Sequence, residues 1–317
     1  MRVCLMIEGQ EGVSWDQWIA LADACEEHGL EGLFRSDHYR SLDREPDLGT
    51  LDAWVTLGAL ADRTERIRLG TLVSPVTFRH PAVLARSAIT VDRISGGRLE
   101  VGMGAGWHVG EHRAFGFPYP EDRERLDILE EQLEIVHRLW HGDDSPFEGR
   151  HYRLEGIRAM PRPVQQPHPP LILGGGGKGR SARLAARWAD EYNTSFATPE
   201  QCRERRDRVA RAWERQGRDP AELRFSVMTG IVLGADRDDL FRRAADHAER
   251  FGEGGEPAAY LEALRADAWV VGTVPEVVRW LHAYEEAGVY RVMLQHLPHE
   301  DLETVEMLVT EVAPAVA

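Results

Sequence analysis

The chain has 317 residues, of which 43% are hydrophobic and 29% are charged. This balance is typical of globular proteins and excludes a disordered or fibrous chain. Asp and Glu outnumber Lys and Arg by 53 to 38, which gives a net charge of -15. So acidic a chain repels phosphate backbones and anionic lipid headgroups, which argues against nucleic-acid and membrane binding. No apolar run in the sequence approaches the roughly 20 residues of a bilayer-spanning helix.

Three widely spaced cysteines, Cys4, Cys25 and Cys202, form no C-x-x-C pair. Neither a disulfide framework nor a thiolate metal site is therefore expected. The opening segment MRVCLMIEGQ turns acidic too early for a secretory signal peptide. These features predict a cytoplasmic protein that holds no metal.

Short strand-like runs alternate with longer helix-like stretches along the whole chain. Strands are predicted at 2–7, 31–35, 67–73, 98–103, 170–175, 191–195, 223–233 and 289–294. Helices are predicted at 14–28, 50–62, 80–94, 121–141, 178–188, 199–216, 236–250, 256–266, 275–287 and 300–312. Ser14 is the expected N-cap of the first helix, and Gly29 its end.

Eight strand–helix alternations imply parallel strands joined by crossover helices. The strands are apolar throughout, as expected when both faces of a sheet are covered. We therefore predict an α/β protein, a (β/α)8 TIM barrel that forms one domain over 1–317, with an open doubly wound sheet as the alternative. Residues 147–154 are expected to form a hairpin, and the proline-rich stretch 161–170 an insertion.

Polar or glycine-rich residues follow four of the predicted strands. They are SDHY at 36–39, VSP at 73–75, GMGAGWH at 102–108 and GGGG at 174–177. In a barrel the carboxyl ends of the strands meet on one face, where active sites are built. We expect these four segments to form a single site.

Asp37 and His38 place a carboxyl group and an imidazole at one of these strand ends. A histidine can donate or accept a proton near neutral pH. His38 is therefore a candidate catalytic residue, with Asp37 beside it. A purely structural hydrogen bond is the alternative.

The glycine run at 174–177 stands between a strand and the start of a helix. Backbone N–H groups in such a turn can approach an anion, and the helix terminus adds partial positive charge. This predicts a phosphate cradle at Gly175, Gly176 and Gly177, with a flexible turn as the alternative. The run is not a P-loop, because Gly179 stands where Ser or Thr is required.

Residues 108–112 read HVGEH, which matches the inverted zinc-peptidase motif H-x-x-E-H. That motif requires a helix, so that both histidines share one face. Gly110 and the glycine-rich strand end before it favour a loop in which Glu111 holds the local backbone. No zinc site is therefore expected.

Taken together, these segments resemble the luciferase-like monooxygenase superfamily, most closely its branch that uses the deazaflavin coenzyme F420. The similarity covers nearly the whole chain. It rests on the order and spacing of SDHY (36–39), RIRLGTLVSPVTFRHPAVLA (66–85), TVDRISGGRLEVGMGAGWHVGEHRAFG (90–116), FEGRHYRL (147–154), PPLILGGGGKGRSARLAARWADEYN (169–193) and GTVPEVVRWLHAYEEAGVYRVML (272–294).

The resemblance implies a barrel with an insertion and a flavin-type ring across its mouth. It places a non-prolyl cis peptide at Leu72–Val73 behind the ring, and His38 near the ring. The cofactor contacts that it implies are Leu72, Val73, Ser74, Ala105, Gly106, Gly175, Gly176 and Gly177. Sugar-phosphate dehydrogenases of this branch carry a catalytic Glu where this chain has Trp107, which argues against a sugar phosphate. Trp107 is then expected to wall the ring or the substrate, or else to plug the barrel rim.

The activity implied is hydride transfer between F420 and a small organic substrate. A two-component monooxygenase that receives reduced FMN from a separate reductase is the alternative, and a barrel that binds a flavin without turnover is a third reading. Arg79, Lys178 and Arg180 are expected to hold the carboxylate tail of F420. The family resemblance also implies a homodimer.

Overall fold

The computed structural model describes residues 1–42, 48–156 and 158–317 of the chain. Its eight main strands are parallel and close into a barrel, because β9 pairs with β10. This confirms the predicted (β/α)8 fold and excludes the open doubly wound sheet. The barrel strands are β1 (Arg2–Ile7), β2 (Gly32–Arg35), β3 (Arg68–Thr71), β5 (Leu99–Gly104), β8 (Leu171–Gly174), β9 (Glu191–Ser195), β10 (Arg224–Gly234) and β12 (Arg291–Gln295).

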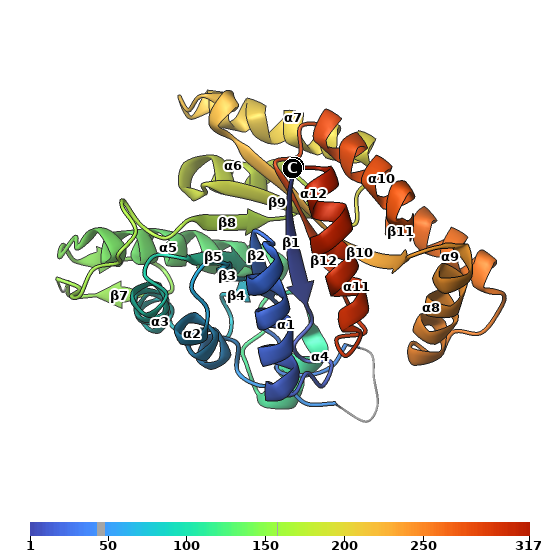
Figure 1. Cartoon of the computed structure of the whole chain (residues 1–317). Helices are drawn as coiled ribbons and strands as arrows, with labels where there is room; N and C mark the ends of the chain where they lie inside the picture. Colours follow the sequence, from blue (N-terminus) through green and yellow to red (C-terminus); the bar gives the residue numbers. More distant parts are fainter. Residues whose placement is uncertain (43–47, 157) are drawn as a thin grey trace.

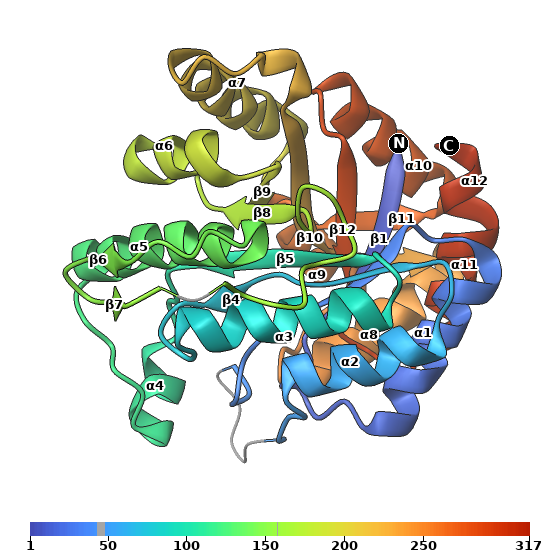
Figure 2. The same cartoon turned by 90° about the vertical axis from the view of Figure 1, so that its left-hand side faces the viewer.

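Helices surround the barrel (Figures 1 and 2). They are α1 (Trp15–His28), α2 (Ala53–Arg63), α3 (Pro81–Ile94), α5 (Asp122–His141), α6 (Gly179–Trp188), α7 (Pro199–Arg215), α10 (Val274–Glu286), α11 (Leu302–Met307) and α12 (Ala313–Ala315). Ser14 caps α1 as predicted, because its side chain and that of Gln17 exchange hydrogen bonds with each other's backbone N–H. Gly29 ends α1 with a φ of 94°. Among the described residues no helix is long and apolar enough to cross a membrane.

Three excursions interrupt the strand–helix alternation. The predicted hairpin is present as β6 (Phe147–Glu148) and β7 (Arg153–Leu154), and β4 (Ser74–Pro75) pairs with β5. The third excursion extends β10 beyond the barrel and contains α8 (Arg237–Arg250), α9 (Pro257–Ala266) and β11 (Val270–Thr273). It has a small apolar core of its own, and Figure 1 shows α8 and α9 at the periphery of the molecule.

Within the described residues, the structure contains the strands β4 and β11 and the helix α4 (Val109–Phe115), none of which the sequence analysis predicted. Strand β11 has only four residues, which is too short for a periodic pattern. The seven-residue helix α4 contains Gly110 and has no N-cap hydrogen bond from His108. The prediction of a loop at 108–112 was therefore wrong. Local sequence signals for a helix are weak there, and Glu111 and His112 are held by buried contacts instead.

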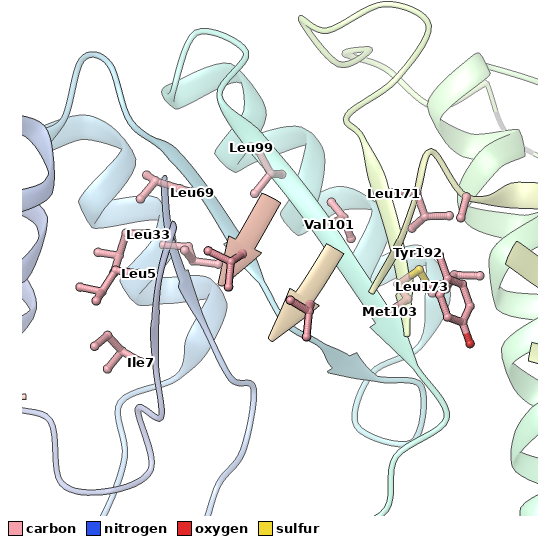
Figure 3. Close-up of a cluster of buried hydrophobic side chains, with 14 of the residues drawn as sticks. Leu5, Ile7, Leu33, Leu69, Leu99, Val101, Met103, Leu171, Leu173 and Tyr192 are labelled. Carbon is pink, nitrogen blue, oxygen red and sulfur yellow. The ribbon is translucent and has the colours of Figure 1, made fainter. Parts of the chain in front are cut away.

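The barrel strands alternate between an outward and an inward face, as parallel strands with a period of two must. Outward side chains such as Leu5, Leu33 and Val101 pack under the helices and form the main core (Figure 3). A smaller cluster fills the barrel interior with Cys4, Met6, Phe34, Leu72, Ile172 and Met293. Cys4 and Met6 occupy the inward-facing positions of β1, and the next position on that face is Glu8, just past the carboxyl end of the strand.

Below the interior cluster, three charged side chains occupy the barrel. Arg291 Nε donates to Glu191 Oε1 at 3.0 Å, and the same guanidinium pairs with Glu100. All three side chains are at most 4% exposed. These groups and the apolar cluster above them fill the described interior of the barrel, so a cavity at the carboxyl ends of the strands is the candidate site.

Candidate functional site

A cavity of about 810 Å³ opens at the carboxyl ends of the barrel strands. Residues that directly follow six of the barrel strands (β1, β2, β3, β5, β8 and β9) contribute to its wall. They include residues of the four segments that the sequence analysis expected to form a single site. The wall comprises Glu8, Glu11, Ser36, His38, Leu42, Leu72, Val73, Pro75, Gly104, Ala105, Gly106, Trp107, Gly174, Gly175, Asn193, Ser195, Phe196, Met228, Phe251, Gln295 and Leu297.

His38 lines this cavity and is paired with Glu111. The imidazole Nδ1 lies 2.7 Å from Glu111 Oε1, and Glu111 Oε2 accepts the Tyr39 N–H at 3.0 Å. Because a carboxylate only accepts, Nδ1 carries the proton of this contact and Nε2 is the nitrogen left to exchange a proton with a bound molecule. The sequence analysis assigned Glu111 to the local backbone but did not foresee its bond to His38.

Burial and the neighbouring charges shift the pKa of His38 in opposite directions. Burial lowers the pKa of the imidazole, but the hydrogen bond and charge of Glu111, together with the charges of Glu8 and Asp37, outweigh it. The net pKa of His38 is therefore raised above its ordinary value, which favours the protonated ring. A histidine held in this way is suited to donate a proton as well as to accept one.

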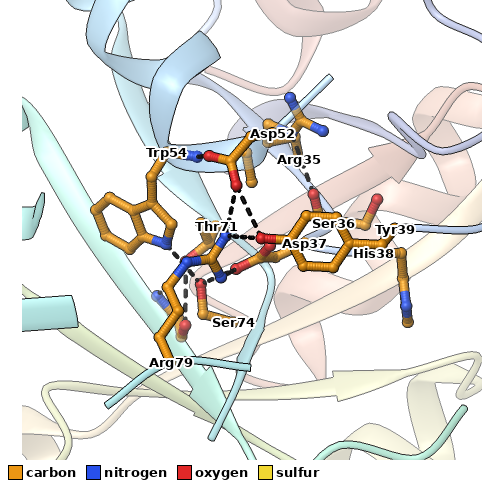
Figure 4. Close-up of polar contacts among 12 residues, drawn as sticks. Arg35, Ser36, Asp37, His38, Tyr39, Asp52, Trp54, Thr71, Ser74 and Arg79 are labelled. Carbon is orange, nitrogen blue, oxygen red and sulfur yellow. Dashed lines mark hydrogen bonds and ion pairs between the residues drawn. The ribbon is translucent and has the colours of Figure 1, made fainter. Parts of the chain in front are cut away.

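Asp37 does not accompany His38 into the cavity, which corrects its assignment as a catalytic neighbour. Its carboxylate accepts the hydroxyl of Ser74 at 2.6 Å and pairs with Arg79, away from the His38 ring (Figure 4). Arg79 also lies 2.9 Å from Asp52. Arg79 is held by these ion pairs and does not line the cavity, which argues against the prediction that it holds a cofactor tail.

Ser74 is likewise buried and absent from the cavity wall, although the resemblance placed it among the cofactor contacts. Its hydroxyl accepts the Trp54 indole N–H at 3.1 Å and donates to Asp37 (Figure 4). Ser74 therefore joins the end of β2 to β4, and its side chain supports the segment behind the cavity.

The peptide bond between Leu72 and Val73 is cis, as the resemblance implied. Both residues line the cavity. The glycines of β5 make room for this segment. A Cβ on Gly102 would lie 2.2 Å from the Thr71 carbonyl oxygen, and one on Gly104 would lie 2.6 Å from the Val73 side chain. The alternating glycines of GMGAG therefore leave room beside β5 for the segment that contains the cis peptide.

Trp107 stands on the rim of the cavity with 61% of its surface exposed. Its ring meets the His38 ring edge to face, with the centroids 5.6 Å apart. Ala105 and Gly106 precede it on the same wall. An exposed aromatic ring beside the catalytic candidate offers apolar area to a bound molecule. The geometry therefore favours contact of Trp107 with the cofactor ring or the substrate over a role in closing the barrel rim.

The glycine run forms a loop that ends at α6. Gly174, Gly175 and Gly176 are exposed, and a Cβ on Gly176 would meet no atom within 4 Å. No described side chain caps the first turn of α6, which begins at Gly179. An exposed loop that leads into an uncapped helix N-terminus fits a phosphate group.

One residue of the predicted cradle and one predicted contact of the cofactor tail need correction. Gly177 is buried and donates its N–H to the Tyr192 hydroxyl at 2.9 Å, so that N–H is not available to an anion. Arg180 is paired with Asp127 and, at 2.6 Å, with Glu130, so it is not a free cation for a cofactor tail. The side chain that reaches the loop is Arg208, which donates to the Gly176 carbonyl at 3.3 Å and was not predicted.

The H-x-x-E-H segment is helical but serves other contacts. His112 Nε2 lies 2.7 Å from the Thr77 hydroxyl, and His112 Nδ1 lies 2.7 Å from the His108 carbonyl oxygen. Glu111 is bound to His38 and Tyr39 as described above. Within residues 1–42, 48–156 and 158–317, no three His, Cys, Asp or Glu side chains are grouped to hold a metal ion.

The sequence analysis also missed the polar wall opposite the cis peptide. Glu8 follows β1 and Gln295 ends β12, and the Gln295 amide donates to the Glu8 carboxylate. Asn193 belongs to the same wall from β9. The signal that could have found Glu8 is the period of two in RVCLMIE, which places it on the inward face with Cys4 and Met6.

Comparison with known proteins agrees with this fold. A family model described as luciferase-like monooxygenase matches residues 2–291. The chain is 31% identical over 303 residues to a protein of Nakamurella multipartita named F420-dependent glucose-6-phosphate dehydrogenase, an alignment that covers 89% of this chain and 86% of that protein.

Two solved structures are also similar over their full length. Monooxygenase RslO1 from Streptomyces bottropensis has a TM-score of 0.83 and 25% identity, with 100% of each chain covered. An F420-dependent secondary alcohol dehydrogenase in complex with an F420-acetone adduct has a TM-score of 0.82 and 20% identity, with 100% of this chain and 99% of that chain covered.

Proposed function

Because this chain belongs to the luciferase-like monooxygenase family, we propose that it is an oxidoreductase that transfers a hydride between coenzyme F420 and a small organic substrate. The observation that carries the proposal is the cavity, which has the His38–Glu111 pair on one wall and the cis peptide Leu72–Val73 on another. F420, when bound, supplies the hydride chemistry. The protein supplies orientation, exclusion of water and a proton.

The residues present fit such a cofactor. Leu72, Val73, Ala105 and Gly106 form an apolar wall of the kind that receives a flat ring. Gly175, Gly176 and the start of α6 would hold its phosphate. His38 would hold or release a proton at Nε2, since Glu111 occupies Nδ1. Trp107 would cover the substrate on the open side of the cavity.

The choice of F420 over FMN is supported by the Nakamurella multipartita relative, whose name specifies F420 and whose alignment covers most of both chains. Similarity to RslO1 over all of both chains favours the second candidate, a two-component monooxygenase that uses reduced FMN from a separate reductase. The cytoplasmic location, the homodimer and the single domain over 1–317 stay predictions.

An anaerobic titration would separate the two candidates. F420, a precursor of F420 that lacks the tail, and FMN would each be added to the protein, with binding followed by fluorescence at low and at high salt. We expect F420 to bind most tightly, because Lys178, at the start of α6, stays predicted to hold the carboxylates of its tail. The advantage of F420 over the tail-less precursor should then fall with salt. Equal affinity for all three, or oxygen uptake with reduced FMN and none of the expected F420 binding, would support the monooxygenase instead.

A further inference from the structure

One wall of the cavity carries a carboxylate, that of Glu8, whose direct partners are neutral side chains. Glu8 is 8% exposed, and its two oxygens accept the side-chain N–H groups of Gln10, at 2.7 Å, and of Gln295. Both donors are neutral amides. Glu8 forms no ion pair with a residue of the described ranges, and its carboxylate lies beside the space that a substrate would fill.

The remaining wall offers an anion little compensation. Of the described lining residues none is Lys or Arg, and the only other ionisable groups are Glu11 and His38. The positive charge of a protonated His38 is already paired with the Glu111 carboxylate. The rest of the surface away from the glycine loop is neutral and largely apolar. Its main apolar side chains are Leu42, Trp107, Phe196, Met228, Phe251 and Leu297.

This charge distribution discriminates between headgroups. A phosphate ester placed here would lose its hydration without gaining a guanidinium or ammonium partner, and Glu8 would repel it. A hydroxyl or ammonium group gains instead, because it can donate a charge-assisted hydrogen bond to the carboxylate. The apolar side chains would receive the body of either molecule.

We propose that Glu8 determines the substrate class of this enzyme. The substrate is an uncharged or cationic organic molecule that donates a hydrogen bond to Glu8 through a hydroxyl or amino group, and phosphate esters are excluded. This inference rests on the proposed function. It separates the chain from the Nakamurella multipartita relative, whose name gives glucose 6-phosphate as its substrate.

Three probes that share one apolar body and differ in headgroup would test this. Cyclohexanol, protonated cyclohexylamine and cyclohexyl phosphate would be titrated into the F420-loaded protein, with binding measured by saturation-transfer NMR. The alcohol and the amine should bind, and the phosphate ester should bind at least about tenfold more weakly than the alcohol, as expected from one lost charged hydrogen bond. Binding of the phosphate ester at or above the level of the alcohol would overturn the proposal.

The variant Glu8→Gln removes the charge at nearly constant size. It should weaken binding of the amine by about tenfold, and it should reduce the difference in affinity between the alcohol and the phosphate ester. Glu148→Gln changes the net charge equally on the exposed hairpin β6–β7, where the glutamate side chain is 71% accessible, and should change neither affinity. Unchanged amine affinity in folded Glu8→Gln would contradict the proposal. The ranking of the three probes on the unmodified chain tests it even if the variant does not fold.

The same measurements distinguish this inference from the proposed function. If F420 fails to bind while the probes keep the expected order on the unloaded protein, the cofactor assignment fails and the role of Glu8 stands. If F420 binds and the phosphate ester binds as well as the alcohol, the cofactor assignment stands and the role of Glu8 is refuted.

Discussion

His38 Nδ1 and Glu111 Oε1 lie 2.7 Å apart although 73 residues separate them in the chain. The first follows β2 and the second lies in α4, so the contact exists only because the barrel brings the ends of β2 and β5 to one face. Glu111 is fully buried and also holds the Tyr39 N–H, which fixes the direction of its carboxylate. We infer that Glu111 positions His38 and sets its charge.

Replacing Glu111 with Gln should lower the pKa of His38. The variant keeps a hydrogen-bond acceptor near Nδ1 but removes the negative charge that offsets burial of the ring. The His38 resonance would be followed by NMR as a function of pH in the parent and the variant. Glu130→Gln, an exchange on the outer helix α5, should leave that pKa in place. An unchanged pKa in Glu111→Gln would show that the pair does not set the charge of His38.

The same pair should make a pH-dependent contribution to stability. Because the folded-state pKa of His38 is raised, its contribution is fully present below the unfolded pKa of about 6.5 and is lost as the pH rises through the folded-state pKa. The loss of stability in Glu111→Gln should therefore be larger at acid pH than at pH values above the folded-state pKa. Urea unfolding of parent and variant across this range would measure the difference in their free energy of unfolding. A difference that grows as the pH rises would contradict this prediction.

His38→Ala should remove most turnover with any substrate that the enzyme accepts. Loss of a general acid or base typically lowers the rate by about 10²–10⁴-fold. Affinity for F420 should change only a few-fold, because the proposed cofactor contacts lie on other segments of the cavity wall. Steady-state kinetics and a fluorescence titration would be compared for the two proteins. Turnover that survives in the variant would make His38 a structural residue.

Gly176→Asp should weaken cofactor binding about tenfold or more, which corresponds to about 1.4 kcal/mol. The loop has room for the side chain, since no atom lies within 4 Å of the added Cβ, so the variant should fold. Its carboxylate would repel a phosphate at the start of α6. Gly254→Asp makes the same change at another open position, outside the cavity wall, and is the matched control. Equal cofactor affinity in both variants would show that this loop does not bind the phosphate.

The sequence predicts the barrel well because its signals are local. Each strand is a short apolar run, and each crossover helix has its own periodicity. The cis peptide at Leu72–Val73 was instead implied by the family resemblance, and the structure confirms it. Contacts between distant segments carry no such signal. Whether Asp37 faces His38 or Arg79 depends on where β4 and the loop between β4 and α3 place Ser74 and Arg79. The pairing of His38 with Glu111 depends on α4, a helix too short to be recognised.

Arg291 should be needed for stability rather than for chemistry, because it lies deep in the barrel between Glu100 and Glu191. Arg291→Met would leave two buried carboxylates beside each other. Glu100 would keep the cation Arg68 as a partner, and Glu191 would keep only the neutral hydroxyl of Ser226. Breaking a buried ion pair from one side typically costs about 3–5 kcal/mol. Urea unfolding should show this loss, and adding Glu191→Gln to the variant should recover part of it, because one uncompensated charge is removed. Arg63→Met breaks an exposed pair with Asp23 and should change stability little. A loss in Arg291→Met no larger than in Arg63→Met would show that the barrel tolerates these carboxylates without the guanidinium.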